Sequence, residues 1–222
     1  MVYLLKEYND PAGWVRGMTI KSFLYDHFIS GRYDRELAEV TDDFRKILFE
    51  RMAIPPGATV LDLGCGTGLN QPHLAAAVGP EGKIIGLDAS SQMLEQARER
   101  AKQGGYADRL TLTQGDARAL HTLVDASPDA VVATLIFSVV PAWRDVFQKS
   151  YELLKPGGRY GIMDNYWPNP SLRLWFLSWT FAADAKRPGF EPLSRSADEF
   201  NLEYHPPDAD VQFYIAYGTK PC

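Results

Sequence analysis

The 222-residue sequence predicts an α/β fold built on a doubly wound, mostly parallel sheet of seven strands. Short β-rich apolar runs alternate with stretches of helical periodicity up to residue 166. The run at 129–140 is apolar almost throughout, as expected of a parallel strand covered on both faces. Two later runs, 199–205 and 210–218, alternate apolar and polar residues, and they are predicted to close the sheet with an antiparallel C-terminal edge strand.

The periodicity of the apolar residues sets the individual elements. Apolar side chains recur every three or four residues between Arg35 and Met52, which predicts a helix. Ser90 or Ser91 can cap a further helix, whose buried face would carry Met93, Leu94 and Ala97. The other predicted helices are 71–78, 143–154 and the aromatic-rich segment 171–185, a loop is predicted at 187–195, and the other predicted strands are 59–64, 84–88, 109–116 and 159–166.

Composition limits the class of protein. A mass of 24.9 kDa suits one α/β domain with appended segments. The net charge of −5 argues against nucleic acid as the main partner, since phosphate binding needs a basic surface.

Localisation can also be predicted from the sequence. Cys65 and Cys222 lie far apart, so a disulfide framework is not expected. The first ten residues lack a secretory pattern, and the longest nearly apolar run, 130–140, is too short to cross a bilayer. We expect a cytoplasmic protein without a transmembrane segment, able to contact the inner membrane face peripherally.

The segment VLDLGCGTGLN at 60–70 is the strongest single motif. Three glycines between a strand and a helix place backbone N–H groups at the end of the sheet, where a dinucleotide, a phosphate or another nucleoside compound can bind. The spacing is G-x-G-x-G and not the dinucleotide pattern G-x-G-x-x-G, and a phosphate-binding loop would need a lysine that is absent between 60 and 82. Asp62, just before the loop, favours a cationic ligand.

Two more acids follow the next strands. Asp88 comes 22 residues after Gly66, where a carboxylate can accept both hydroxyl hydrogens of a ribose. Asp116 is predicted to end the third strand, where it can accept a hydrogen from an adenine amino group. A helix N-cap is the alternative interpretation of Asp116.

The segments VLDLGCGTG, IIGLDASSQML, GDARAL and LLKPGGRYGIMD resemble, in order and spacing, the motifs of the class I S-adenosylmethionine-dependent methyltransferases, over about residues 56–166. The resemblance implies the Rossmann-like methyltransferase fold, S-adenosyl-L-methionine as cofactor and S-adenosyl-L-homocysteine as product. It implies that the glycine loop surrounds the methionine part, that Asp88 holds the ribose, and that Cys65 packs without acting as a nucleophile. The cofactor-binding residues that it implies are Asp62, Gly64, Cys65, Gly66, Gly68, Asn70, Asp88, Ala89, Met93, Asp116, Ala117, and Leu135 and Ile136 at the end of the fourth strand.

Methyl transfer from a sulfonium needs mainly alignment and exclusion of water, so no catalytic triad is expected. The four histidines show no metal-ligand spacing, and no metal is predicted. The stretch YDHFISGRYD resembles the lid of quinone and phospholipid methyltransferases. In the alternative interpretation, its tyrosines only anchor an N-terminal helix to the domain. Residues 1–50 are therefore expected to form a helical lid, and 51–222 the cofactor-binding domain with an acceptor-side insertion at about 167–197.

The acceptor is predicted from weaker patterns. FSVVPAW and FAADAKRPGFEPL resemble the bacterial N-methyltransferases of phosphatidylethanolamine and diacylglyceryl-homoserine. Aromatic residues with flanking cations at 172–181 suit an interface with lipid, or a helix that packs on the sheet. The side chains predicted to hold a cationic acceptor, and thus the catalytic candidates, are Tyr25, Tyr33, Asp164 and Tyr166.

The leading prediction is a methyltransferase that acts by in-line displacement on a small or lipid-borne nucleophile, most simply a head-group amine of a phospholipid or betaine lipid. Methylation of a quinone-type or other small metabolite is the alternative within the same class. Two further alternatives are a protein that binds the cofactor without catalysis and a nicotinamide oxidoreductase, which the glycine spacing disfavours.

Overall fold

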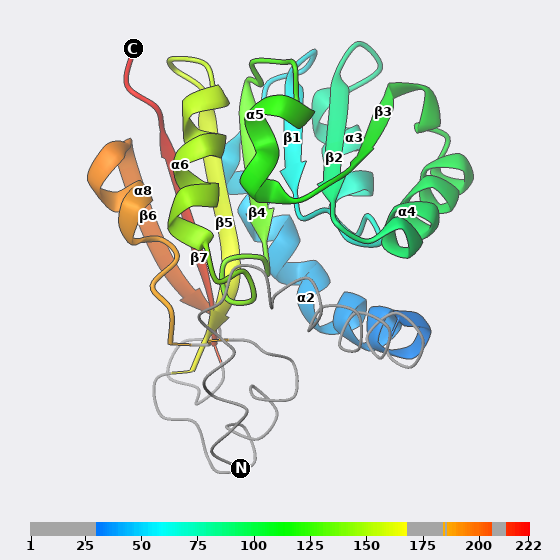
Figure 1. Cartoon of the computed structure of the whole chain (residues 1–222), viewed down its shortest axis with the longest axis horizontal. Helices are drawn as coiled ribbons and strands as arrows, with labels where there is room; N and C mark the ends of the chain where they lie inside the picture. The colour runs from blue at the N-terminus through cyan, green and yellow to red at the C-terminus, as the bar shows by residue number, and fades with distance from the viewer. Residues whose placement is uncertain (1–29, 168–183, 185, 206–211) are drawn as a thin grey trace. The chain divides into compact units, whose positions relative to one another are not determined.

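In the computed structural model of the protein, seven strands form one sheet in the order β3-β2-β1-β4-β5-β7-β6 (Figure 1). The structure describes the backbone of residues 30–40 and all of residues 41–167, 184, 186–205 and 212–222. The chain divides into two compact units, 1–40 and 41–222, and the sheet belongs to the second. The strands are β1 (Thr59–Leu63), β2 (Lys83–Asp88), β3 (Leu110–Gln114), β4 (Ala130–Thr134), β5 (Arg159–Tyr166), β6 (Asp198–His205) and β7 (Gln212–Thr219).

The first five strands of the chain run parallel, and β7 runs antiparallel to both of its neighbours, β5 and β6. The predicted seven-stranded, mostly parallel sheet is therefore confirmed. The antiparallel strand is not at the edge itself, because β7 lies between β5 and the edge strand β6.

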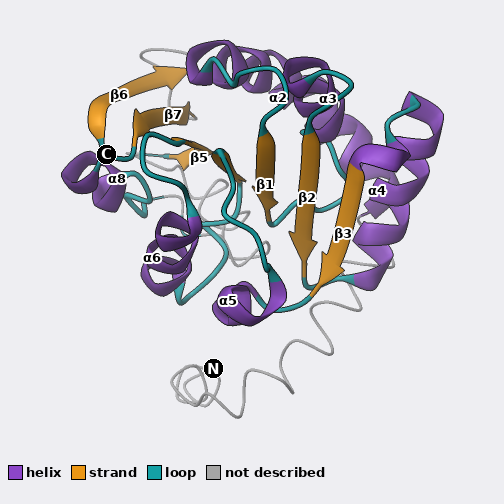
Figure 2. Cartoon of the chain, turned by 90° about the horizontal axis from the view of Figure 1, so that it is seen from above, coloured by secondary structure: helices purple, strands orange, loops and turns teal. Residues whose placement is uncertain are grey.

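Helices lie against both faces of the sheet, as Figure 2 shows from above. Residues 41–52 of α2 pack on one face with α3 and α4, and α5, α6 and α8 pack on the other. The helices are α2 (Ser30–Met52), α3 (Gln71–Val78), α4 (Ser91–Gly104), α5 (Leu120–Leu123), α6 (Trp143–Leu153) and α8 (Glu191–Ser196), with short 3-10 turns η3 (Ala107–Arg109) and η4 (Ala117–Ala119).

Each face of the sheet carries its own buried cluster. In β1, Val60 packs with Leu48, Met52 and α3, whereas Leu61 and Leu63 pack on the opposite face with α6. This division follows from the alternation of side chains along a strand. Asp62 has the parity of Val60, so its carboxylate faces the side of α2 and α3.

Most elements agree with their sequence predictions to within a few residues, including α3, β5 and the capping of α4 by Ser90, whose hydroxyl accepts from the backbone N–H of Met93. Two predictions were wrong in detail. The strand predicted at 129–140 ends at Thr134, because Leu135 has a left-handed φ of 57° that turns the chain out of the sheet. The loop predicted at 187–195 contains α8, which starts with Glu191 and a proline in its first turn. The helix predicted at 171–185 lies mostly outside the described residues.

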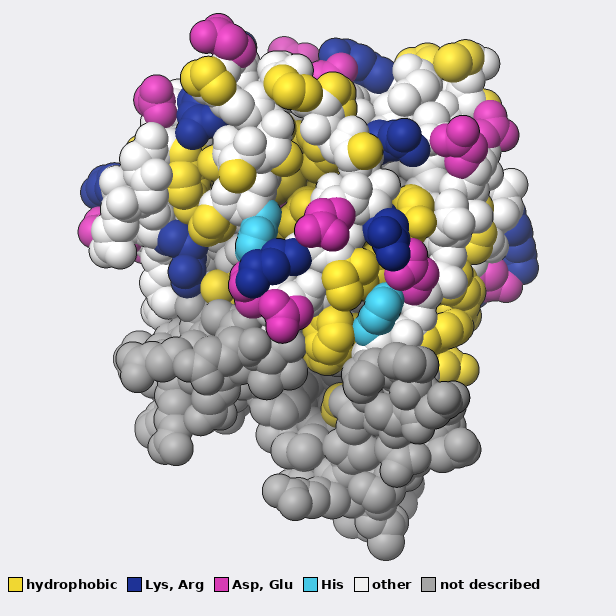
Figure 3. Space-filling view, turned by 180° about the vertical axis from the view of Figure 1, so that it is seen from behind, with side chains coloured by type: hydrophobic (Ala, Val, Ile, Leu, Met, Phe, Trp, Pro, Cys, Tyr) yellow, Lys and Arg dark blue, Asp and Glu magenta, His cyan; other side chains and the backbone are white. Residues whose placement is uncertain are grey.

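Charged side chains of both signs lie next to one another on the face shown in Figure 3. On α2, Lys46 pairs with Asp42, and Arg51 pairs with Glu203 of β6. Such exposed pairs contribute little to stability. Within the described part of the chain, no helix combines the length and the apolar character that a membrane span requires.

Candidate active site

The glycine loop follows β1 and packs on Ile136, the second residue after β4. A Cβ placed on Gly64 would lie 2.6 Å from Cδ1 of Ile136, so a side chain at position 64 would displace Ile136. The backbone N–H of Cys65 donates to the carbonyl of Leu87 at 3.0 Å, which holds the loop against the end of β2. This contact brings together Gly64 and Ile136, two of the predicted cofactor-binding residues.

Gly66 connects the loop to Asp88, the last residue of β2. The N–H of Gly66 donates to Oδ2 of Asp88 at 2.9 Å, and the N–H of Ser90 donates to Oδ1 at 2.9 Å. Gly66 has a left-handed φ of 52°, and a Cβ built on it would meet nothing within 4 Å. The loop therefore presents bare backbone and open space beside a fixed carboxylate.

Asp62 is fully buried beneath this loop. Its Oδ1 accepts a hydrogen bond from Nδ2 of Asn70 at 2.7 Å, and the same amide nitrogen donates to the hydroxyl of Thr134 at 2.9 Å. Its Oδ2 has no hydrogen-bond partner among the described residues. A buried carboxylate oxygen without a partner is costly, and its presence indicates a ligand or a functional role.

Burial raises the pKa of Asp62 from 3.8 to about 7, against the opposing effects of the Asn70 hydrogen bond and the Arg45 charge. Because the folded pKa exceeds the unfolded one, Asp62 contributes most to stability below pH 4, and the contribution is lost as the pH rises through 7. We expect the free energy of unfolding of the cofactor-free protein, relative to that of D62N, to fall by up to about 4 kcal/mol between pH 4 and pH 8. Urea unfolding of the wild type and of D62N across this pH range measures the two free energies, and a difference between them that does not change with pH would contradict the prediction.

Cys65 is buried, and its burial raises the pKa of the thiol well above its ordinary value. A thiol that stays protonated is a poor nucleophile. The structure thus favours the interpretation of Cys65 as a packing residue, and both cysteines are free.

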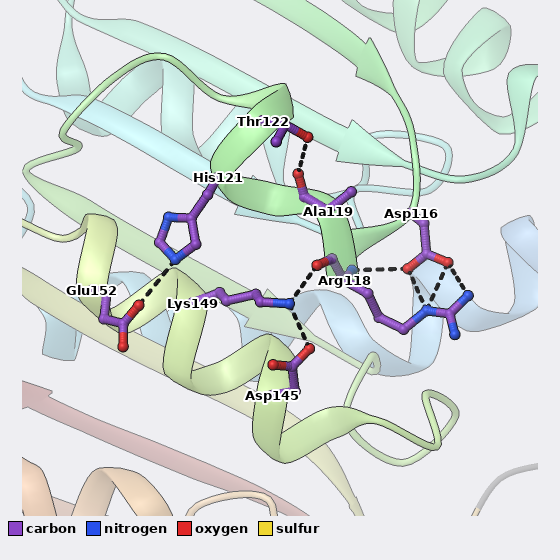
Figure 4. Close-up of polar contacts among 8 residues, drawn as sticks. All are labelled: Asp116, Arg118, Ala119, His121, Thr122, Asp145, Lys149 and Glu152. Atoms are coloured by element: carbon purple, nitrogen blue, oxygen red, sulfur yellow. Dashed lines mark hydrogen bonds and ion pairs between the residues drawn. The ribbon is translucent and has the colours of Figure 1, made fainter. Parts of the chain in front are cut away.

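Asp116 does not end β3, which stops at Gln114. Its carboxylate caps η4 by accepting from the N–H of Arg118 at 2.8 Å, and it also pairs with the Arg118 guanidinium (Figure 4). The hydrogen bond to the Arg118 side chain is the main reason that the pKa of Asp116 is lowered. Asp116 is therefore the N-cap of η4 in the structure. A contact of Asp116 and Ala117 with adenine stays a prediction.

The surroundings of Asp116 tie η4 to α6. Lys149 of α6 donates to the Arg118 carbonyl at 2.6 Å and to Asp145 at 2.8 Å, and His121 pairs with Glu152 (Figure 4). These exposed contacts hold η4 and α5, the segment after β3, against α6.

Ala89 and Met93 follow Asp88 in the chain. Ala89 directly follows β2, and Met93 lies buried in the first turn of α4. Both are close in sequence to Asp88, as the predicted adenine contacts require, although no described contact assigns them that role.

The segment after β4 is held in an unusual backbone conformation. Leu135, a residue with a Cβ, has a φ of 57°, which costs about 1–2 kcal/mol. Its N–H donates to the carbonyl of Met163 at 2.8 Å, and the guanidinium of Arg187 donates to the carbonyls of Phe137 and Val140, both at 2.7 Å. The surrounding contacts thus compensate the cost of the turn.

Asp164 of β5 completes this support. It is 1% exposed, and its Oδ2 accepts from the N–H of Ser138 at 2.9 Å. Burial raises its pKa to about 6, opposed by hydrogen bonds from Ser138, Asn165 and Phe137. Asp164 therefore positions the segment after β4, and its predicted direct contact with the acceptor stays a prediction.

The other predicted catalytic residues are aromatic. Tyr166, at the end of β5, is partly buried and packs on Tyr204 with ring centroids 5.0 Å apart. Tyr25 and the side chain of Tyr33 lie outside the described residues. The His, Cys, Asp and Glu side chains in the described part of the chain form no group of three that could hold a metal ion.

Sequence reasoning missed Arg45, Thr134 and Arg187. Arg45 could have been found from the sequence, because a charged residue stands on the apolar face of α2 with Leu48 and Met52. Thr134 and Arg187 carry no such signal, since their partners come from distant parts of the chain.

The sheet order, with a glycine loop after β1 and an acid ending β2, defines the Rossmann-like methyltransferase fold. A family described as a methyltransferase domain matches residues 60–158. The demethylmenaquinone methyltransferase of Lactobacillus johnsonii is 36% identical over 137 residues, which are 61% of this chain and 56% of that protein. The match therefore spans just over half of that relative's length.

A second relative is covered more fully. The demethylmenaquinone methyltransferase of Lactococcus lactis is 32% identical over 189 residues, which are 78% of this chain and 73% of that protein. The geranyl diphosphate C-methyltransferase of Streptomyces coelicolor A3(2) has a TM-score of 0.68 at 15% identity, over 84% of this chain and 81% of that one, a likeness of fold alone. The chain belongs to the class I S-adenosylmethionine-dependent methyltransferases.

The residues present fit the cofactor of this family. An adenosyl sulfonium carries a ribose, an ammonium group and a positive sulfur. Asp88 lies where a ribose can be held, the buried Asp62 has an oxygen without a partner for the ammonium, and the space beside Gly66 admits a ligand on bare backbone. The cofactor supplies an electrophilic methyl group on sulfur.

Proposed function

We propose that this protein methylates a ring carbon of a reduced, quinone-type aromatic acceptor. The observation that carries the proposal is the 32% identity to the Lactococcus lactis demethylmenaquinone methyltransferase over 73% of that protein. The same name recurs for the Lactobacillus johnsonii relative at 36% identity.

The described residues beside the glycine loop support an apolar acceptor. Leu135 and Ile136 follow β4, Ile136 lies against Gly64 of the loop, and Val139, three residues further along the chain, is 42% exposed. An apolar surface of this kind suits an aromatic ring better than a charged head group.

The chain's own residues would contribute mainly alignment. The glycine loop and Asp88 would hold the cofactor, and Asp164 and Arg187 would fix the segment against which the acceptor lies. A ring carbon that gains a methyl group must release its proton, which can pass to a water molecule, and Tyr25, Tyr33 and Tyr166 are the proposed residues beside the acceptor.

The amine acceptor of the sequence analysis has less support. The curated relatives described above are both named for a quinone-type substrate, so the alternative is now the better supported reading. Peripheral contact with a membrane stays a prediction, because the aromatic segment 172–181 lies outside the described residues.

Incubation of the full chain with S-adenosylmethionine labelled in its methyl group tests the proposal. A short-chain demethylmenaquinol kept reduced by dithionite is expected to take up the label, whereas the oxidised quinone and vesicles of phosphatidylethanolamine are not. Transfer to the lipid amine with none to the quinol would reject the proposal and restore the amine prediction. The variant D88A serves as the control for enzyme-dependent transfer.

A further inference from the structure

Arg45 is a buried arginine on the apolar face of α2. It is 3% exposed, and it shares this face with Leu48 and Met52, which are 0% and 1% exposed. By contrast, Lys46 and Arg51 of the same helix form exposed ion pairs. A buried guanidinium is retained only where hydrogen bonds and an opposite charge compensate its desolvation.

The partners of Arg45 lead directly to Asp62. Its Nε donates to Oδ1 of Asn70 at 2.9 Å, and its Nη1 donates to the hydroxyl of Thr41. The other end of the Asn70 amide, Nδ2, donates to Oδ1 of Asp62 at 2.7 Å. One amide therefore bridges a guanidinium and a carboxylate.

This bridge fixes the orientation of Asn70. An amide has a single acceptor oxygen and a single donor NH2 group. Because Arg45 is a donor only, the amide oxygen must face α2, and the NH2 group must then face Asp62 and Thr134. A reversed amide would place its oxygen against the Asp62 carboxylate and its NH2 group against the guanidinium.

The charges around Asp62 determine its ionisation. Burial favours the neutral acid, the negative charge of Asp88 on β2 acts in the same direction, and the positive charge of Arg45 on α2 acts against them. The Cys65 thiol and the Tyr106 phenol also face Asp62, whose charge is among the causes of their raised pKa values. Asn70 and Thr134, from the ends of α3 and β4, are neutral.

We propose that Arg45 is a positioning residue for cofactor binding, which acts through Asn70 to favour the ionised form of Asp62 and to leave its second oxygen for the cofactor's ammonium group. The proposal rests on the assignment of the chain as a methyltransferase and deepens it. It also couples the C-terminal half of α2 to the cofactor site, since Thr41 and Arg45 belong to that helix.

Calorimetric titration of the full chain with S-adenosylhomocysteine between pH 6 and pH 8.5 tests the proposal. Without Arg45, Asp62 should ionise at least about one pH unit higher, so R45Q should bind at least about fivefold more weakly at pH 7 and within about threefold of the wild type at pH 8.5. R45K keeps the charge but not the planar donor fork, and it should shift the pH midpoint upward by a smaller amount. Every protein is titrated with the same ligand, so the ligand's own ionisation cancels in the ratio.

The matched control is R51Q, which removes an arginine of the same helix whose partner is the surface residue Glu203. It should bind as the wild type does at every pH. A loss of affinity in R45Q that is equal at all pH values would indicate a merely structural role and overturn the proposal. If R45Q does not fold, R45K decides, and an unshifted pH midpoint in R45K would overturn the proposal as well.

The outcome is separable from that of the proposed function. Wild-type protein that binds the ligand with this pH dependence, but methylates no quinol, would reject the acceptor and leave the role of Arg45 standing. Transfer to the quinol, together with a loss of affinity in R45Q that is equal at all pH values, would reject the role of Arg45 and leave the acceptor standing. Wild-type protein that does not bind S-adenosylhomocysteine would reject both.

Discussion

Replacing Asp88 with alanine is expected to weaken the binding of S-adenosylhomocysteine at least about 100-fold. The carboxylate accepts the N–H of Gly66 at 2.9 Å and the N–H of Ser90 at 2.9 Å, and it lies where a ribose would be held. Loss of hydrogen bonds to a charged group costs about 3 kcal/mol or more in this setting, which corresponds to about a 100-fold change in Kd. Isothermal titration calorimetry measures the change.

Two further variants make the Asp88 test specific. D88N keeps one acceptor oxygen and should lose less affinity than D88A. D108A removes an exposed acid from the turn after α4 and should bind as the wild type does. Unchanged affinity in D88A would contradict the assignment of Asp88 and, with it, the position of the cofactor.

Replacing Gly66 with alanine is expected to abolish most cofactor binding while the protein still folds. The new methyl group meets nothing within 4 Å in the protein, so it would occupy the space left for the ligand. A clash of this kind costs about 2 kcal/mol or more, which raises Kd at least about 30-fold. The left-handed φ of 52° adds a loss of stability of roughly 1–2 kcal/mol.

Gly105 provides the matched control for Gly66. It has a left-handed φ of 69° at the C-terminal cap of α4, and its Cβ would also meet nothing within 4 Å. G105A should therefore lose a similar amount of stability in thermal unfolding and keep the wild-type Kd. Equal affinities of G66A and G105A would place the cofactor away from the glycine loop.

The fold was predictable because the local sequence patterns predict the same strands and helices that the sheet requires. The buried runs at 60–63 and 130–134 and the glycine and proline turns between them each predict one element of an alternating β and α pattern. The pattern failed at Leu135, where an apolar residue continues the strand in sequence but turns out of it in the structure. Composition carries no sign of that turn, since contacts from β5 and from Arg187 stabilise it.

The cofactor site was predictable in part for a similar reason. Gly64, Gly66 and Asp88 lie at strand ends, where chain order alone brings them to one edge of a parallel sheet. Asp116 shows the limit of that reasoning, because a neighbouring side chain, Arg118, takes up its carboxylate. Arg45 could be placed only once α2 was known to pack beside Asn70.

The position of β7 has a consequence for how the protein is made. Among the described strands, β6 joins the sheet through β7, which follows it in the chain. Until residues 212–219 emerge, β5 has an open hydrogen-bonding edge and β6 has nowhere to dock. The nascent chain thus carries two unpaired edges until β7 is synthesised, a state prone to association with other chains, and a truncation that removes β7 would make that state permanent.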